Sequence, residues 1–342
     1  MRFAYEIKNG CAVVRRCYDF GNEAEIPSEI DGHPVTELGA YAFSAHMDRE
    51  QFWHELGNRT VKIWNPETGE QEVSEPDAET VPGLQGMQVE TVRLPEGLRK
   101  IGAYAFYNCN ALSELHFHSS LKDLGAGLFT GCHHLRRLNV TLDETETSCL
   151  KEILIEVPEK MAVTVEGQLR AKLLFPEFFE ESVENTPARI IMREMHGCGH
   201  MYRYCFDGGD FRFDEYDRLS PHVKVQEKPE LAVRLALYRL YWPCGLRESA
   251  EDEYWDYVRT HAGEGAKGLI ERGERDILGF MARSARLGED EIKKMIEAAA
   301  GSGDAQSSAL LLDVKHRRLS PAGRNGQGEE AKRCGRKRTF EL

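Results

Sequence analysis

The sequence predicts an α+β fold, in which a short solenoid of stacked coils carries an irregular insertion and is followed by an α-helical hairpin module. The first observation is that the segment 89–138 repeats itself at a fixed offset of 23 positions, as from 92 to 115 and from 101 to 124. A period in the twenties is typical of coils that stack to bury a shared core. The second is that beyond Pro229 apolar residues recur at intervals of three and four, the spacing of one helix face.

The repeat unit is defined by residues that lie 23 positions apart. The run 101–106 matches the run 124–129, and the pairs that continue the match are Cys109 with Cys132 and Leu112 with Leu135. In a strand triplet such as 115–117, the outer side chains point to one face and the middle one to the other. We expect Phe43, Phe106 and Phe129 to form a buried ladder. Gly102 and Gly125 are expected at turns, where glycine tolerates unusual dihedrals.

The phrase Gly-Ala-Tyr-Ala-Phe-Tyr-Asn-Cys at 102–109, followed by Leu112, resembles the BspA-type leucine-rich repeats. The resemblance covers about residues 3–140 and is specific at 89–138. It implies a short leucine-rich-repeat solenoid that serves as a recognition scaffold, because members of the family bind proteins or surface ligands. The run 38–43 repeats the run 101–106 at an offset of 63 positions, from 43 to 106. An insertion of about 40 residues therefore interrupts the array after the first coil.

These patterns divide the chain into six segments: an N-terminal cap with the first repeat coil (1–44), the insertion (45–88), repeat coils with capping strands (89–160), a mixed connecting region (161–227), a helical-pair module (228–316) and a basic tail predicted to be disordered (317–342). Strands are expected at Leu150–Val157 and, as a hairpin, at Met161–Phe175. A helix is expected at Pro176–Met195, and 196–227 reads as irregular. The helical pairs resemble ankyrin-like repeats, with Leu269, Ile277, Leu278, Ile296 and Leu310–Leu312 between them.

Composition narrows the partners and the location. The net charge of −13 argues against a general nucleic-acid binder, although 315–338 holds nine bases and two acids that would suit an acidic partner or nucleic acid. The start has no apolar leader segment, and no run approaches the length of a membrane span. Nine scattered cysteines do not form a disulfide framework. We therefore expect a cytoplasmic protein with no membrane contact. No phosphate loop or dinucleotide motif is present, so no cofactor is predicted.

Two alternatives to a scaffold follow from other features. His196, Cys198, His200 and Cys205 are residue types that ligate zinc, so a hydrolase or metal-dependent enzyme built on 150–227 is one alternative. The competing interpretation of this segment is a glycine-rich turn, since the spacing is not that of a zinc knuckle. The other alternative is a surface adhesin whose export signal lies outside this chain.

The predicted binding surface is the exposed side of the repeat strands. The middle residues of the strand triplets are Arg93, His116 and Asn139, which follow one another at the repeat offset. The neighbouring column contains Thr91, Glu114 and Arg137 by the same arithmetic. Counterparts on adjacent strands lie about 5 Å apart, so the columns form a continuous polar strip on a rigid base. We expect Arg93, Glu114, His116, Arg137 and Asn139 to bind a protein partner; the alternative is that they only keep the sheet soluble.

Overall fold

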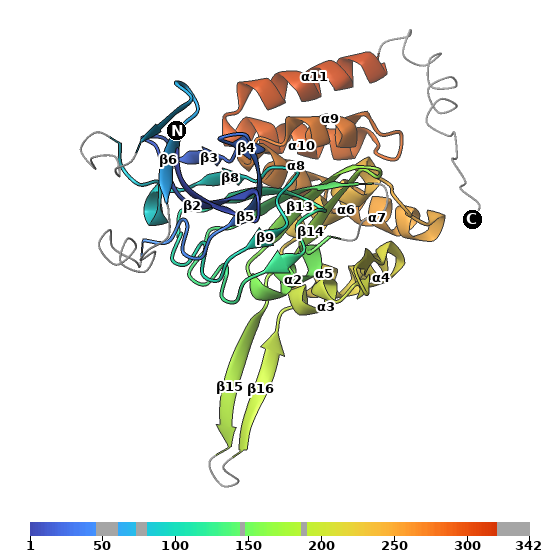
Figure 1. Cartoon of the computed structure of the whole chain (residues 1–342). Coiled ribbons are helices and arrows are strands. Elements are labelled where there is room, and N and C mark those ends of the chain that lie inside the picture. Colours follow the sequence, from blue (N-terminus) through green and yellow to red (C-terminus); the bar gives the residue numbers. More distant parts are fainter. Residues whose placement is uncertain (46–60, 73–80, 144–147, 186–189, 320–342) are drawn as a thin grey trace. The chain divides into compact units, whose positions relative to one another are not determined.

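The computed structural model describes residues 1–45, 61–72, 81–143, 148–185 and 190–319 (Figure 1). The chain divides into two units, Met1–Gln226 (unit 1) and Glu227–Leu342 (unit 2). Unit 1 contains the predicted solenoid, and unit 2 is helical throughout its described part. The α+β class is therefore confirmed. Among the described residues, no helix is both long and apolar enough to cross a membrane.

The exposed face considered below belongs to a sheet of six strands in unit 1. In spatial order they are β14 (Ala171–Phe175), β13 (Met161–Gly167), β12 (Arg137–Leu142), β10 (Glu114–His118), β8 (Thr91–Arg93) and β3 (Glu23–Glu25). Strands β3 to β13 are parallel, and β14 returns antiparallel beside β13. Strands β8, β10 and β12 pair in the register of the repeat, with Leu115 opposite Val92 and Leu138 opposite Leu115. The array also continues one strand beyond residue 140, where the sequence pattern fades.

The other large sheet of unit 1 follows the order β11 (Asp123–Leu124), β9 (Lys100–Ile101), β5 (His33–Leu38), β2 (Cys11–Tyr18), β1 (Arg2–Lys8), β6 (Lys62–Asn65) and β7 (Glu70–Glu72), with β4 (Glu29–Ile30) beside β5. Strand β6 lies inside the predicted insertion and pairs with β1. The expectation that 45–88 stands apart from the solenoid is therefore wrong for this strand, whose Ile63 packs in the core. Residues 46–60 and 73–80 lie outside the described residues.

A ladder of phenylalanine rings fills the coils between the two sheets. The ring centroids of Phe43 and Phe106 lie 5.4 Å apart, and those of Phe106 and Phe129 lie 5.6 Å apart. All three side chains are buried. The thiol of Cys109 donates to the carbonyl oxygen of Phe43 at 3.1 Å, and the Cys132 thiol makes the equivalent contact with Phe106 at 3.0 Å. The predicted ladder and its buried cysteines are confirmed.

The glycines of the repeat act through close packing rather than through dihedral freedom. Neither Gly102 nor Gly125 has a positive φ, but a Cβ added at Gly102 would lie 2.3 Å from the amide nitrogen of Ala40 in the neighbouring coil. Only a residue without a side chain lets the coils approach so closely. The left-handed conformation occurs instead two positions later, at Tyr104 and Gly127, with φ of 58° and 62°.

Three expectations for the end of unit 1 are wrong. Leu150–Glu156 forms helix α2 instead of a strand, because Leu150, Ile153 and Leu154 share the one buried helix face. Pro176–Met195 is not helical: β15 (Phe179–Asn185) and β16 (Ile190–His196) form an antiparallel hairpin that extends away from the solenoid (Figure 1). The region 196–227 is ordered as α3 (Gly199–Arg203), β17 (Phe206–Asp207), β18 (Asp210–Phe211), α4 (Phe213–Arg218) and α5 (Ser220–Gln226).

Unit 2 consists of α6 (Pro229–Tyr241), α7 (Glu248–Thr260), α8 (Ala262–Glu271), α9 (Arg275–Arg283), α10 (Glu289–Ser302) and α11 (Ala305–Leu319). Helix α8 packs against both α6 and α10. Arg234 holds α6 to the start of α9 through a paired contact with Glu274, at 2.9 and 2.8 Å. Leu269, Ile277 and Leu278 are buried as predicted, whereas Leu312 is 52% exposed, so its predicted core position is wrong.

Candidate functional site

Strand register places the predicted binding residues on one face of the six-stranded sheet. Arg93 pairs with His116, and His116 with Asn139, so the three form one column across β8, β10 and β12. Glu114 and Arg137 form the neighbouring column. Leu115 and Leu138, which alternate with these residues, are buried on the opposite side. The sequence therefore identified two adjacent columns of one strip, in which Arg93 and Arg137 are exposed and Glu114, His116 and Asn139 are half-buried. Thr91, the third residue predicted for the second column, is buried, so its predicted exposed position is wrong.

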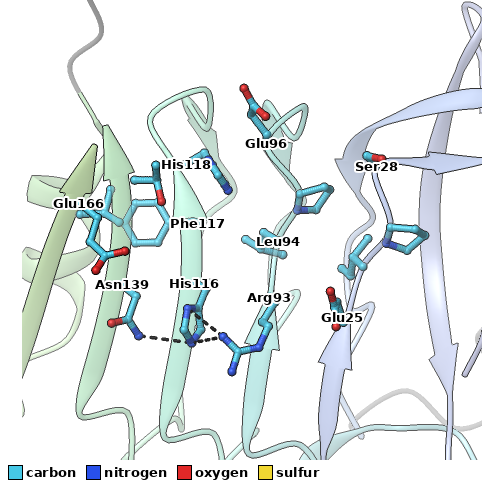
Figure 2. A pocket seen from close by; sticks show the side chains of 15 residues that line it. Glu25, Ser28, Arg93, Leu94, Glu96, His116, Phe117, His118, Asn139 and Glu166 are labelled. Carbon is cyan, nitrogen blue, oxygen red and sulfur yellow. Dashed lines mark hydrogen bonds between the residues drawn. The ribbon is translucent and has the colours of Figure 1, made fainter. Parts of the chain in front are cut away.

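An open groove of about 570 Å³ runs across the strands over this strip (Figure 2). Its floor contains Arg93, His116 and Asn139, and its two ends reach Glu25 on β3 and Glu166 on β13. Further wall residues come from the segments that follow β3 and β8, among them Pro27, Ser28, Pro95 and Glu96, and from the later positions of β10 and β12, which are His118 and Thr141. Because the floor is a hydrogen-bonded sheet, the backbone positions from which its side chains project are fixed before any ligand arrives.

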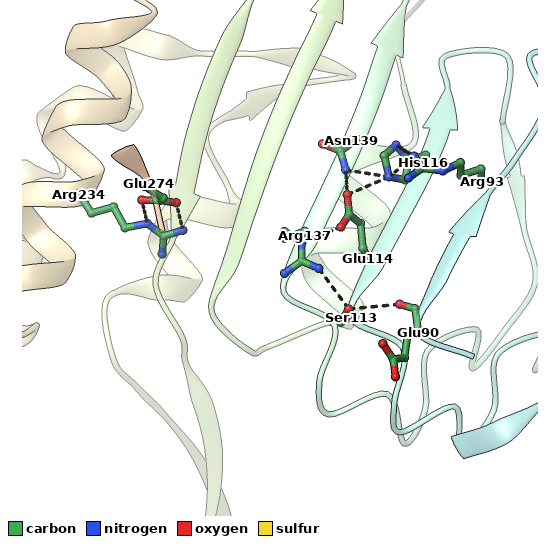
Figure 3. A network of polar contacts seen from close by, with 9 residues as sticks. All are labelled: Glu90, Arg93, Ser113, Glu114, His116, Arg137, Asn139, Arg234 and Glu274. Atoms are coloured by element: carbon green, nitrogen blue, oxygen red, sulfur yellow. Dashed lines mark hydrogen bonds and ion pairs between the residues drawn. The ribbon is translucent and has the colours of Figure 1, made fainter. Parts of the chain in front are cut away.

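Glu114 is the centre of a polar network beside the groove (Figure 3). One carboxylate oxygen accepts a hydrogen bond from Arg137 Nε at 2.7 Å. The other accepts from Asn139 Nδ2 at 2.7 Å and lies 2.8 Å from His116 Nε2. Arg93 Nη1 lies 3.0 Å from His116 Nδ1 and 2.7 Å from His116 Nε2. With a proton on Nε2, the ring donates to Glu114 and leaves Nδ1 as its acceptor for Arg93.

The charges in this network shift two pKa values. Burial alone would raise the pKa of Glu114, but the hydrogen bond and positive charge of Arg137 outweigh it and hold that pKa below its usual range. Burial, together with the neighbouring charge of Arg93, lowers the pKa of His116 despite the opposing effect of Glu114. At neutral pH the strip therefore presents an ionised Glu114, a neutral His116 and two arginines.

These shifts predict how stability changes with pH. The unfolded chain protonates His116 near its ordinary pKa of about 6.5, whereas the folded site resists the proton until lower pH. Acidification thus favours the unfolded state, and the free energy of unfolding should fall as the pH drops from 7 through this window. Because the pKa of Glu114 is also lowered in the folded state, the free energy of unfolding should fall further at still lower pH, where this carboxylate becomes protonated.

Urea titrations at pH 7, 6 and 5 test this expectation on the wild type and on His116→Gln. Glutamine can still accept from Arg93 and donate to Glu114, but it does not titrate. The variant should lose less stability than the wild type between pH 7 and pH 5. Equal losses in the two proteins would show that the neutral state of His116 contributes nothing to folding.

Several groove residues were not predicted. Glu25 pairs in register with Arg93, and the similarity of Glu25-Ile26-Pro27 to Arg93-Leu94-Pro95 is the signal that would have placed it in the column. Glu166 enters through the pairing of β12 with β13, where it lies opposite Thr141 and the offset between partners widens from 23 positions to 25. No repeat arithmetic reveals that change. His118 belongs to a third column, two positions beyond His116 on the same strand.

The cysteine and histidine residues proposed as metal ligands do not gather into a site. Cys198 and Cys205 are buried. His196 instead stacks on Phe179, with ring centroids 4.8 Å apart, and His200 contacts the carbonyl oxygen of Gly197. Across the residues that the structure describes, no three histidine, cysteine or acidic side chains are arranged to hold a metal ion. The segment instead passes from β16 through Gly197, with a φ of 84°, into helix α3, and both thiols are buried.

Parallel strands that pair at the repeat offset around a phenylalanine ladder define unit 1 as a repeat-protein solenoid. Residues 84–157 match the family model described as BspA type leucine rich repeat region (6 copies). The predicted resemblance is thereby confirmed for this stretch. The comparison with curated proteins finds no match.

Solved structures similar to this chain are leucine-rich repeat proteins. One, from Bacteroides capillosus, is 18% identical, with 48% of this chain and 94% of that chain covered and a TM-score of 0.27. A leucine rich cell surface protein from Faecalibacterium prausnitzii is 13% identical, with 48% and 40% covered and a TM-score of 0.24. The T. pallidum leucine rich repeat protein is 17% identical, with 40% and 68% covered and a TM-score of 0.22.

Proposed function

We propose that this chain is a cytoplasmic, non-enzymatic protein-interaction scaffold that binds a protein partner through the groove over β3, β8, β10, β12 and β13. The observation that carries the proposal is the groove itself, whose floor is a rigid parallel sheet lined by Arg93, His116 and Asn139. A preformed surface of this kind loses little conformational entropy on binding. Arginine is also the charged residue most often found as an interface anchor.

The remaining segments take supporting parts in this proposal. Unit 2 is proposed to be an ankyrin-like helical-pair module that adds a second interaction surface. The enzyme alternative is not favoured by the cysteine-histidine segment, because Cys198 is buried and His196 stacks on Phe179. The surface adhesin would use the same groove, so it differs from the scaffold in location and not in geometry.

Quantitative affinity capture from the native cell extract tests the scaffold. The bait proteins are the wild type and the combined variant Arg93→Ala, His116→Ala, Arg137→Ala. We expect the variant to recover at least about tenfold less of the bound partner, because each truncation removes a side chain from the strip and anchor residues dominate interface energies. Fractionation of the native cell separates the scaffold from the adhesin, since an adhesin would be recovered with the cell surface.

A matched control is the variant Arg212→Ala, Arg218→Ala, His222→Ala, which removes the same three residue types from exposed or half-exposed positions outside the groove. It should capture the partner as the wild type does. Thermal unfolding of each bait shows that it is folded. If the groove variant is folded and captures as much partner as the wild type, the groove is not the binding site.

A further inference from the structure

The groove carries an uneven pattern of charge. Three exposed carboxylates line it, from Glu25, Glu96 and Glu166, against one guanidinium from Arg93. None of the three carboxylates forms an ion pair with any residue that the structure describes. Carboxylates engaged in folding are normally paired or hydrogen-bonded, whereas these are left to solvent around a concavity. No ion pair therefore gives these three carboxylates a part in stabilising unit 1.

Arg93 is the complementary feature on the floor. Its Nη1 contacts the neutral His116 ring, and within the described part of the chain its guanidinium makes no contact with a carboxylate. An arginine side chain presents five donors in a planar fork that fits a carboxylate with two parallel hydrogen bonds. Arg93 thus keeps donors available beside a neutral neighbour, inside a groove that is otherwise acidic.

We infer that the groove binds an extended segment of a protein partner that is basic at both ends and carries one acidic residue between them. This inference rests on the proposed function and adds the chemistry of the partner. The acidic residue pairs with Arg93, one basic residue meets Glu25, and the other meets Glu166, while Glu96 adds negative charge to the wall of the groove. Nucleic acid does not fit, because three carboxylates would face its phosphates.

Strand spacing sets the distances between these charges. Adjacent strands lie about 4.8 Å apart, and an extended peptide advances about 3.3 Å per residue. Glu25 is one strand from Arg93, which corresponds to about one or two residues of the peptide. Glu166 is three strands away in the other direction, which is about 14 Å across the sheet or four residues of the peptide. It also lies two positions further along its strand than the partner of Asn139, an offset of about 7 Å that the length of a lysine side chain can span. The fitting sequence is therefore Lys-x-Glu-x-x-x-Lys, with small uncharged residues at x.

Fluorescence anisotropy with synthetic peptides tests the inference on the full chain. The probe is a labelled Lys-Ser-Glu-Ser-Ala-Ser-Lys peptide with blocked termini. Its two comparison peptides are the charge-reversed Glu-Ser-Lys-Ser-Ala-Ser-Glu and a scrambled peptide with both lysines adjacent. We expect the probe to bind about tenfold or more tightly than either, with affinity falling as salt is raised. Equal affinity for the three peptides, or no measurable binding of any, would overturn the inference.

A charge exchange makes the assignment specific to Arg93. The variant Arg93→Glu should bind the probe about tenfold more weakly, and it should recover affinity for a peptide with lysine in place of the glutamate. Glu166→Lys should recover affinity when the last lysine of the peptide becomes glutamate. Arg218→Glu, outside the groove, should bind the probe like the wild type. Loss in Arg218→Glu equal to that in Arg93→Glu would contradict the inference.

The two levels of the proposal fail in different ways. If the peptides show no dependence on charge order while the groove variant still loses its captured partner, the scaffold stands and the charge pattern is wrong. If capture does not depend on the groove, the proposed function itself fails, whatever the peptides do.

Discussion

Replacing Phe106 with alanine is expected to lower the free energy of unfolding of unit 1 by about 3–5 kcal/mol, the usual cost of removing a buried phenylalanine. The ring is fully buried and stacks on Phe43 on one side and on Phe129 on the other. Its removal would open a cavity in the middle of the ladder, where backbone carbonyls and thiols from adjacent coils also meet. Urea titration followed by circular dichroism measures the loss.

The control for this variant is Phe20→Ala, which makes the same truncation at a side chain that is 73% exposed. It should change the free energy of unfolding by less than about 0.5 kcal/mol, as most surface substitutions do. A loss below about 1 kcal/mol in Phe106→Ala would mean that the solenoid does not depend on the continuity of its ring stack.

Replacing Arg203 with methionine is expected to cost about 4 kcal/mol or more, because several buried carbonyl oxygens would lose their donor at once. The guanidinium donates to the carbonyl oxygens of five residues: Leu154, Val157, Glu159, Pro176 and Gly199, at 2.6 to 3.3 Å. These carbonyls come from the end of α2, the segment after it, the residue that follows β14 and the start of α3. One side chain thus holds together the elements that close the solenoid.

Burial lowers the pKa of Arg203 to about 10, so the side chain stays charged at neutral pH. Arg203→Lys keeps the charge but offers three donors in place of five, and it should recover only part of the lost stability. Arg218→Met is the matched control at a side chain that is 65% exposed, and it should be nearly neutral. If Arg203→Met unfolds at the same urea concentration as Arg218→Met, the carbonyls have found other donors.

The solenoid could be predicted because the same pattern of buried residues recurs in each coil. Each buried position of one coil recurs at the same place in the next, so the phase of Phe106 is supported by Phe129 and, across the insertion, by Phe43. The exposed column of Arg93, His116 and Asn139 follows from the same phase, since alternate residues of a strand face opposite sides. The part of the site that could be predicted is therefore the part that lies inside the regular repeat.

The other features of the fold depend on contacts between distant segments, which the sequence of one segment does not reveal. Leu150–Glu156 is short and apolar, a pattern that suits either a strand or a buried helix, and packing decides between them. Arg203 looks like a surface residue in the sequence, and only the convergence of five carbonyls from distant segments makes it a buried one. Strand β6 is recruited from the insertion because the edge of β1 would otherwise expose unpaired backbone groups.

The antiparallel return of β14 beside β13 gives the groove a fixed length. Because the parallel array ends at β13, beside which β14 returns antiparallel, Glu166 lies three strands from Arg93 on the last parallel strand. The separation of two residues across the exposed face is then set by the number of strands between them, at about 4.8 Å per strand. Inserting one more repeat coil between β10 and β12 would move Glu166 one strand spacing further from Arg93. The contacts within each coil would stay unchanged. Under the proposed binding mode, the length of the bound segment is set by the number of coils and its composition by the side chains of the columns.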